Sequence, residues 1–153
     1  MLVNLLKLPE LEPVMQTMDK ASIVIRRAQT FEITPVRQFI ETNFTLAWAD
    51  ETSVGFANKP VSVFIAMSEG RLLGFAGYEC TRRGFFGPTG VVQYMQGRGI
   101  GKALLLACLW GLHEMGYVYA IIGGAGPVEF YEKTVGASVI PESEPGIYTD
   151  PLR

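Results

Sequence analysis

The chain has 153 residues, of which 48% are hydrophobic and 18% are charged, and its formal net charge is −2 at pH 7. This composition indicates one folded domain and excludes a disordered chain, and the slightly acidic balance argues against a general nucleic-acid binder, which would carry a basic stripe. Two cysteines, Cys80 and Cys108, are too few for a disulfide framework, so we expect reduced thiols in a cytoplasmic protein. There is neither a secretory signal pattern nor an apolar run of the about 20 residues that a membrane span needs, so we expect no membrane partner.

The first part of the chain predicts an extension, a strand and a helix. Residues 1–22, with one short helix interrupted by prolines, are expected to precede the main fold as an extension, so that the domain covers residues 23–153. The β-branched run SIVIRRA at 22–28 predicts a strand. Residues 30–48 predict a helix, and residues 48–59 predict a loop.

The rest of the chain predicts strands and two helices. In chain order we expect strands at 61–67, 71–80 and 85–92, a helix at 99–115, a strand at 117–123, a helix from Pro127 to Gly136, a short strand at 137–140 and at most one more strand around 147–149. Pro88 favours a bulge or a splayed end in the third of these strands. The continuous apolar run at 117–123 is typical of a strand buried on both faces. The order predicts a mixed α/β fold, with a mostly antiparallel central sheet and flanking helices.

A glycine-rich stretch, QGRGIG at 96–101, leads into the predicted helix. The first backbone N–H groups of a helix lack partners and the helix dipole adds about half a positive charge, so glycines there let an anion approach closely. Arg98 and Lys102 add two cationic side chains. A tight turn that only allows close packing of the helix on the sheet is the alternative.

Two nucleotide-binding patterns do not fit this stretch. A P-loop would have glycine at residue 96 and serine or threonine at residue 103, where this chain has Gln96 and Ala103. The dinucleotide pattern would have its third glycine at Lys102 or Leu104, and no acidic residue follows about 20 residues later to bind a ribose.

The pattern Gln96-x-x-Gly99-x-Gly101, after a strand and before a helix, resembles the signature of the GNAT superfamily of N-acyltransferases. A second stretch, GPVEFYEKTVGA at 126–137, is similar to a later motif of the same family, and the predicted elements from Ile23 to about Thr149 match its fold. The resemblance implies a splayed strand pair that binds acyl-CoA, and transfer of an acetyl group from acetyl-CoA to an amine.

The resemblance also implies roles for particular residues. Backbone N–H groups of the loop would bind the pyrophosphate of acetyl-CoA, and the strand backbone would pair with its pantetheine arm; these cofactor-binding residues are Val91, Val92, Gln96, Gly97, Arg98, Gly99, Ile100, Gly101 and Lys102. Tyr131 would stabilise the leaving thiolate by a hydrogen bond, unless it is a core aromatic. Glu79 is the nearest candidate base, because no carboxylate occurs from Thr81 through Met95; a solvent-facing hairpin glutamate is the alternative. No metal is expected.

The predicted helix 99–115 is apolar on all sides, which indicates burial on both faces. Cys108 belongs to the stripe that faces the core. The other face carries Leu105, Leu106, Leu109 and Trp110. Residues 1–22 or a second subunit would cover it, and we expect partial coverage by each, which gives a homodimer.

We therefore expect an N-acetyltransferase that uses acetyl-CoA and acts by direct transfer to a small-molecule or peptide amine. The amine would lie between residues 48–59 and the antiparallel meander of the predicted strands 61–67, 71–80 and 85–92, where Asp50, Glu51 and Glu79 suggest a cationic acceptor. A non-catalytic acyl-CoA-binding or regulatory module is one alternative, supported by the missing strand carboxylate. A structural interaction domain, whose glycines serve packing, is another.

Overall fold

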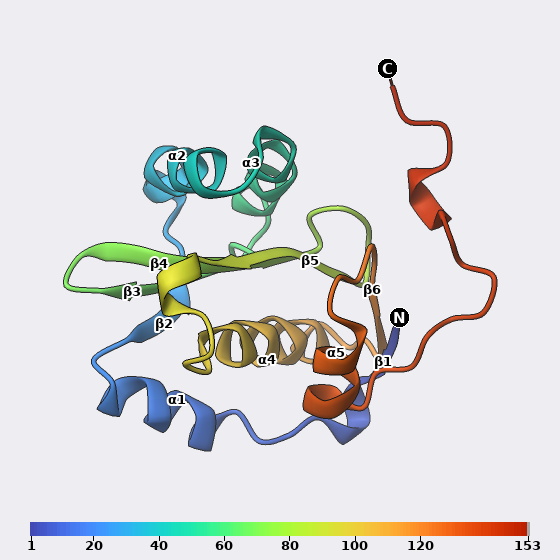
Figure 1. The fold of residues 1–153 in the computed structure, drawn as a ribbon, viewed down its shortest axis with the longest axis horizontal. Coiled ribbons are helices and arrows are strands. Elements are labelled where there is room, and N and C mark those ends of the chain that lie inside the picture. The colour runs from blue at the N-terminus through green and yellow to red at the C-terminus, as the bar shows by residue number, and fades with distance from the viewer. Residues whose placement is uncertain (153) are drawn as a thin grey trace.

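The computed structural model describes residues 1–152, which form one six-stranded sheet with helices on both faces (Figure 1). The strands are β1 Leu2–Asn4, β2 Val24–Arg27, β3 Val63–Ser68, β4 Arg71–Tyr78, β5 Phe85–Val91 and β6 Tyr119–Ile122. The helices are α1 Glu12–Lys20, α2 Ile33–Asn43, α3 Leu46–Ser53, α4 Ile100–Glu114 and α5 Val128–Val135, with 3-10 turns at Leu5–Lys7, Thr30–Glu32, Val54–Phe56, Gln93–Met95 and Gly146–Tyr148. The strand order is β1-β6-β5-β4-β3-β2.

The sheet is mostly antiparallel, as predicted. Of the neighbouring strand pairs, β5 and β6 run parallel and the others run antiparallel. The parallel pair is short, because it is limited to Phe85 opposite Ile121 and Phe86 opposite Ile122. β6 ends there, whereas β5 continues to Val91 with β4 as its neighbour. The two strands therefore part in the middle of the sheet, which confirms the predicted splay.

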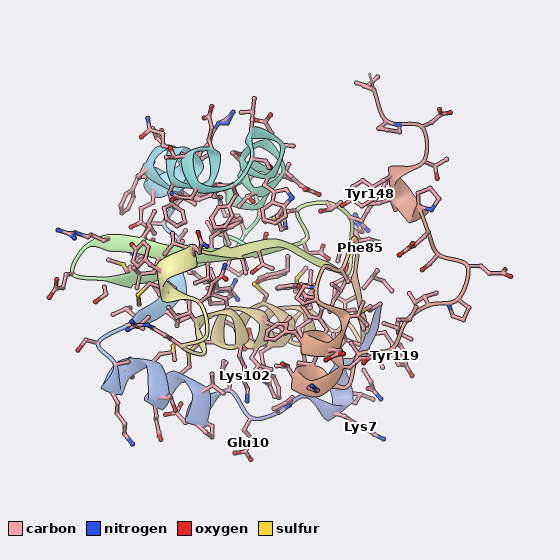
Figure 2. All side chains as sticks on the ribbon, in the orientation of Figure 1. Lys7, Glu10, Phe85, Lys102, Tyr119 and Tyr148 are labelled. Atoms are coloured by element: carbon pink, nitrogen blue, oxygen red, sulfur yellow. The ribbon has the colours of Figure 1, made fainter. Side chains whose placement is uncertain are left out.

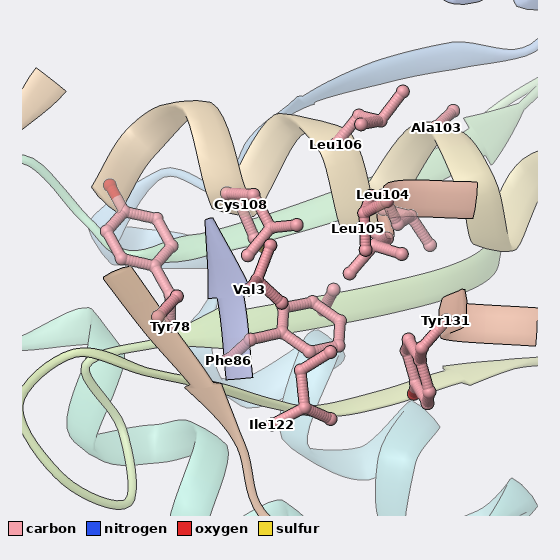
Figure 3. Packing of buried hydrophobic residues seen from close by; sticks show 14 of the residues in the cluster. Val3, Tyr78, Phe86, Ala103, Leu104, Leu105, Leu106, Cys108, Ile122 and Tyr131 are labelled. Atoms are coloured by element: carbon pink, nitrogen blue, oxygen red, sulfur yellow. The ribbon is translucent and has the colours of Figure 1, made fainter. Parts of the chain in front are cut away.

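Two apolar cores lie on the two faces of the sheet. α2 and α3 cover one face, and α4 covers the other with α1 and α5 beside it (Figure 1). α4 supplies much of the larger core, in which its residues from Ala103 to Leu106 pack near Val3, Phe86 and Ile122 (Figure 3). Burial of this helix on both faces, expected from its composition, fixes the position of its N-terminus relative to β5.

The predicted helix at 30–48 is two helices, and the predicted loop at 48–59 is largely helical. The backbone leaves the helical region at Phe44, where φ is −135° and ψ is −105°. Thr45 then begins α3 as its N-cap, because its side-chain oxygen accepts a hydrogen bond from the N–H of Trp48 at 3.1 Å. Residues 48–59 therefore include most of α3 and the turn Val54–Phe56, which gives their side chains fixed directions.

Residues 1–22, predicted as an extension ahead of the main fold, pack as part of the sheet and of its core. β1 pairs with β6 and α1 packs against α4, with Val3 0% exposed. The indole N–H of Trp110 donates to the carbonyl oxygen of Pro9 at 3.0 Å. The leucines on the second face of α4 are buried by this chain itself, so that face gives no reason to expect a second subunit.

Three predicted strands near the C-terminus are shorter than expected or replaced by other structure. Residues 137–140 form one isolated bridge, between Ser138 and Leu2, and residues 147–149 largely belong to the turn Gly146–Tyr148. β6 is not buried on both faces, since Tyr119 is 55% exposed; the layer of α2 and α3 lies over β3 to β5 and leaves β6 open on that side (Figure 1). Among residues 1–152, no helix is both long enough and apolar enough to cross a membrane.

Candidate functional site

A cavity of about 740 Å³ opens where β5 and β6 part. Its walls come from α3, β5, the loop that precedes α4, the first turn of α4, the end of β6, the start of α5, and Tyr148 in the C-terminal segment. Segments far apart in the sequence therefore meet at one place in the sheet. Residues of both sequence motifs therefore line the same cavity.

The glycine loop presents bare backbone to this cavity. Gly97 has φ of 76° and Gly99, the N-cap of α4, has φ of 84°. Residues other than glycine rarely adopt this left-handed backbone conformation. Within residues 1–152, none of the six consecutive backbone N–H groups from Gly97 to Lys102 donates a hydrogen bond. They are the unpaired donors expected at a helix start, gathered beside the positive end of a 15-residue helix.

Close packing does not explain the glycines at positions 97 and 101. A Cβ added at Gly97 would meet nothing within 4 Å, and a Cβ added at Gly101 would meet Val91 Cγ2 at 3.9 Å, an ordinary contact. Gly101 also has an ordinary helical backbone, so neither conformation nor packing requires glycine there. What glycine provides at this position is open space on the cavity side, which argues against a purely structural role.

Most of the predicted cofactor-binding residues lie together around the cavity. Its wall includes Val91, Gln96, Gly97, Gly99, Ile100, Gly101 and Lys102. Arg98 is exposed outside it, and Val92 is buried with its N–H donating to the carbonyl of Leu73 at 2.9 Å. Because successive residues of a strand face opposite sides, the N–H of Val91 points away from β4, toward the gap. The structure therefore brings together the loop, one strand residue and Lys102.

Tyr131 lies in the cavity wall at the core end. It comes from α5, is 6% exposed, and packs edge to face on Phe86 with ring centroids 6.3 Å apart (Figure 3). Its hydroxyl makes no hydrogen bond within residues 1–152, so it is free to donate to a bound molecule. Burial raises the pKa of Tyr131 above its ordinary value of 10.0, which keeps the phenol protonated at neutral pH.

Glu79, the predicted base, does not line the cavity. It lies just after β4 in a left-handed conformation, with φ of 57°, and its carboxylate accepts a hydrogen bond from the N–H of Gly84. This contact closes the hairpin between β4 and β5. These contacts agree with the alternative given for Glu79, a glutamate that belongs to the hairpin.

The cavity also includes side chains outside the predicted cofactor-binding and catalytic sets, and one of them, Glu51, was among the carboxylates suggested for a cationic acceptor. Glu51 and Trp48 come from α3, Thr81 and Phe85 come from the hairpin, and Tyr148 comes from the C-terminal turn. The Thr81 hydroxyl donates a hydrogen bond to the Glu51 carboxylate. Figure 2 shows Tyr148 on the C-terminal segment. A helix prediction that ended at Phe44 and restarted at Thr45 would have given Trp48 and Glu51 a common element.

Comparisons with known proteins identify the fold. No family model and no curated protein matches this sequence. Three solved structures are similar: the glucosamine N-acetyltransferase region of a fungal multi-domain β-N-acetylglucosaminidase (TM-score 0.70, 17% identity, 88% of this chain and 19% of that chain), a GNAT family acetyltransferase from Brucella melitensis in complex with acetyl-CoA (0.58, 22%, 72% and 80%), and an aminoglycoside acetyltransferase from an uncultured soil metagenomic sample (0.57, 20%, 80% and 93%). This chain therefore spans about a fifth of the length of the first of these proteins.

At these identities the likeness demonstrates a shared fold. The chain has the fold of GNAT acetyltransferases, and the fold expected from the two sequence motifs is confirmed. One of the similar structures holds acetyl-CoA.

Proposed function

We propose that this protein is an acetyl-CoA-dependent N-acetyltransferase that transfers the acetyl group directly to an amine. The observation that carries the proposal is the run of six unpaired N–H groups from Gly97 to Lys102, in a loop of which all residues but Arg98 line a cavity in a GNAT fold. Hydrogen bonds to a charged group contribute about 1.5–3 kcal/mol each, so several of these donors acting together suit a pyrophosphate. The two buried cysteines, which form no disulfide, agree with the cytoplasmic location that we propose for it.

The residues around the cavity divide into two groups. The glycine loop and Lys102 would hold the pyrophosphate, and the outward-facing N–H of Val91 would pair with the extended pantetheine arm. Acetyl-CoA supplies the activated acetyl thioester. The parting of β5 and β6 supports this division, because it leaves one side of a strand free for an extended molecule in the interior of the sheet.

Tyr131 would stabilise the leaving group as a hydrogen-bond donor. An ordinary phenol titrates near 10 and a thiol near 8.5, so complete proton transfer from phenol to thiolate is uphill by roughly 2 kcal/mol. Burial raises the pKa of Tyr131 further, which makes full transfer less favourable and keeps the proton on the phenol. A retained proton can still be shared with developing negative charge on sulfur.

Two measurements test this function. Calorimetry with acetyl-CoA tests the loop, and release of free CoA thiol in the presence of a panel of amines tests transfer. Binding followed by amine-dependent thiol release is expected. Absence of acetyl-CoA binding at high micromolar concentration would refute the proposal, whereas binding without thiol release for any amine would favour a non-catalytic acyl-CoA-binding module.

The Tyr131→Phe variant separates the chemical step from binding. Loss of one hydrogen bond to developing charge should lower kcat by roughly 10- to 100-fold, while the Kd for acetyl-CoA changes little. Tyr119→Phe is the matched control, because Tyr119 is 55% exposed on β6 and outside the cavity wall. Unchanged turnover in Tyr131→Phe would show that the phenol has no part in the reaction.

A further inference from the structure

The cavity wall includes one carboxylate, that of Glu51. Of the three that the sequence suggested for a cationic acceptor, Asp50 is exposed and its Oδ1 lies 2.5 Å from Nη2 of Arg37, outside the wall. Glu79 accepts the hydrogen bond that closes the hairpin. Glu51 lies in the wall and, within residues 1–152, forms no ion pair.

Glu51 has a fixed position but no compensating positive charge. The Thr81 hydroxyl donates to its carboxylate, and the rigid helix α3 carries it. The basic side chain in the cavity wall, Lys102, belongs to the first turn of α4 at the loop end. A carboxylate in a cleft without a cationic neighbour is a favourable place for one ammonium group.

Aromatic side chains line the same cavity. Trp48, Phe85 and Tyr148 all belong to its wall. The indole of Trp48 stacks on Phe44, with ring centroids 5.9 Å apart and an angle of 28° between the planes, and it stays 37% exposed. A ring held on one side in this way offers its other side to a ligand. The Glu51 charge also helps to raise the pKa of Tyr148, after burial, which places this phenol in the field of the carboxylate.

We infer that Glu51 binds the ammonium group of the acceptor, and that the acceptor is a small monoamine with a flat apolar body, of the arylalkylamine class. Glu51 then accepts the proton that this nitrogen must lose before it attacks the thioester carbonyl; CoA leaves as the thiolate, and the second amine proton passes to that thiolate. One carboxylate balances one positive charge, and the aromatic wall suits a ring or an apolar chain attached to it. A polyamine or an aminoglycoside carries several ammonium groups, and this wall has one carboxylate to pair with them. The inference rests on the proposed function, since it assigns the acceptor for the same site.

Kinetics with phenethylamine at saturating acetyl-CoA test the inference. Glu51→Gln keeps the shape and can still accept a hydrogen bond from Thr81, but removes the charge. The KM for phenethylamine should rise at least about tenfold and kcat should fall, because the amine proton loses its acceptor, while the KM for acetyl-CoA changes less than about twofold. Asp50→Asn is the matched control and should leave all three constants unchanged, because Asp50 faces Arg37 outside the cavity. In wild type, kcat/KM should be higher for phenethylamine than for spermidine or kanamycin.

A binding measurement keeps the test decisive if turnover is slow. Calorimetry of phenethylamine with the CoA-saturated protein should give a Kd that Glu51→Gln raises about tenfold and Asp50→Asn leaves unchanged. Equal affinity in wild type and Glu51→Gln, no detectable binding to wild type, or a preference for spermidine would each overturn the inference. These failures are distinguishable from failure of the proposed function, which calorimetry with acetyl-CoA reports separately.

Discussion

At the scale of single residues, burial controls the chemistry of the two cysteines. Burial raises the pKa of the Cys80 thiol from 9.0 to about 12, and burial raises the pKa of Cys108 well above its ordinary value. Neither cysteine lines the cavity. A thiol that stays protonated outside the cavity wall is a poor nucleophile, so neither cysteine is a candidate for carrying a covalent acyl intermediate.

These thiols predict a loss of stability in alkaline solution. Because the folded state holds the Cys80 proton up to about pH 12 and the unfolded state releases it near 9.0, stability falls as pH rises from 9 to 12. The slope should be about 1.4 kcal/mol per pH unit for this group, with Cys108 adding to it. Denaturant unfolding from pH 8 to 11 measures the slope, which Cys80→Ala should reduce. An unchanged slope in Cys80→Ala would mean that the thiol ionises equally in both states.

At the scale of one element, α4 carries two glycines with different tasks. A Cβ at Gly111 would lie 2.7 Å from Cζ of Tyr78, whose hydroxyl accepts a hydrogen bond from Nη1 of Arg27 at 2.5 Å, so the ring cannot retreat freely. A Cβ at Gly101 would meet only an ordinary contact. Gly111 thus allows α4 to pack closely against Tyr78, whereas Gly101 leaves space at the cavity wall.

Alanine at these two positions should therefore have opposite effects. Gly111→Ala should destabilise the protein by roughly 1–3 kcal/mol through overpacking. Gly101→Ala should be neutral or stabilising by up to about 1 kcal/mol, because alanine favours a helix, yet it should weaken acetyl-CoA binding about tenfold. Denaturant unfolding and calorimetry measure the two effects. Unweakened acetyl-CoA binding by Gly101→Ala would mean that the space beside this residue is not used.

At the scale of the whole molecule, the N-terminal strand is part of the core. Val3→Asp places a charge at a side chain that is 0% exposed, and it should cost at least about 3 kcal/mol of stability. Val24→Asp is the control, because Val24 lies on the edge strand β2 and is 48% exposed; it should cost less than about 1 kcal/mol. Similar unfolding midpoints for both variants would show that β1 is dispensable.

The sequence predicted the elements whose signals are local. The strands from β3 to β6 and helix α4 follow from apolar periodicity and glycine positions, and the loop at 96–101 follows from its composition. β1 was missed because three residues form a strand only when β6 is beside them. The end of α2 at Phe44 was not predicted, because the apolar pattern continues through it. In the structure the Phe44 ring packs on Phe75 and Trp48, and Thr45 begins a new helix as its N-cap.

In the candidate site, too, the features with local signals could be predicted and those that depend on the packing of distant segments could not. Donors on consecutive residues, such as the loop N–H groups, are predictable because the backbone itself holds them together. Glu79 lies outside the cavity wall because one left-handed residue directs its carboxylate into the hairpin, a local conformation that the sequence pattern does not show. The sequence could not distinguish Glu51 from Asp50. Because the two residues are consecutive on helix α3, their side chains point in different directions: Glu51 lines the cavity and Asp50 pairs with Arg37.

The parted strands give the protein an edge inside its own sheet. An exposed edge usually invites another chain to pair with it, which promotes aggregation. Here the edge lies in the interior of the sheet, under the first turn of α4, where a slender ligand fits better than a second protein. A ligand there would join the two parts of the sheet and stabilise the folded state, so the melting temperature of the protein would rise with the ligand concentration. Ligands of this cavity can then be sought by thermal shift, before any catalytic assay exists.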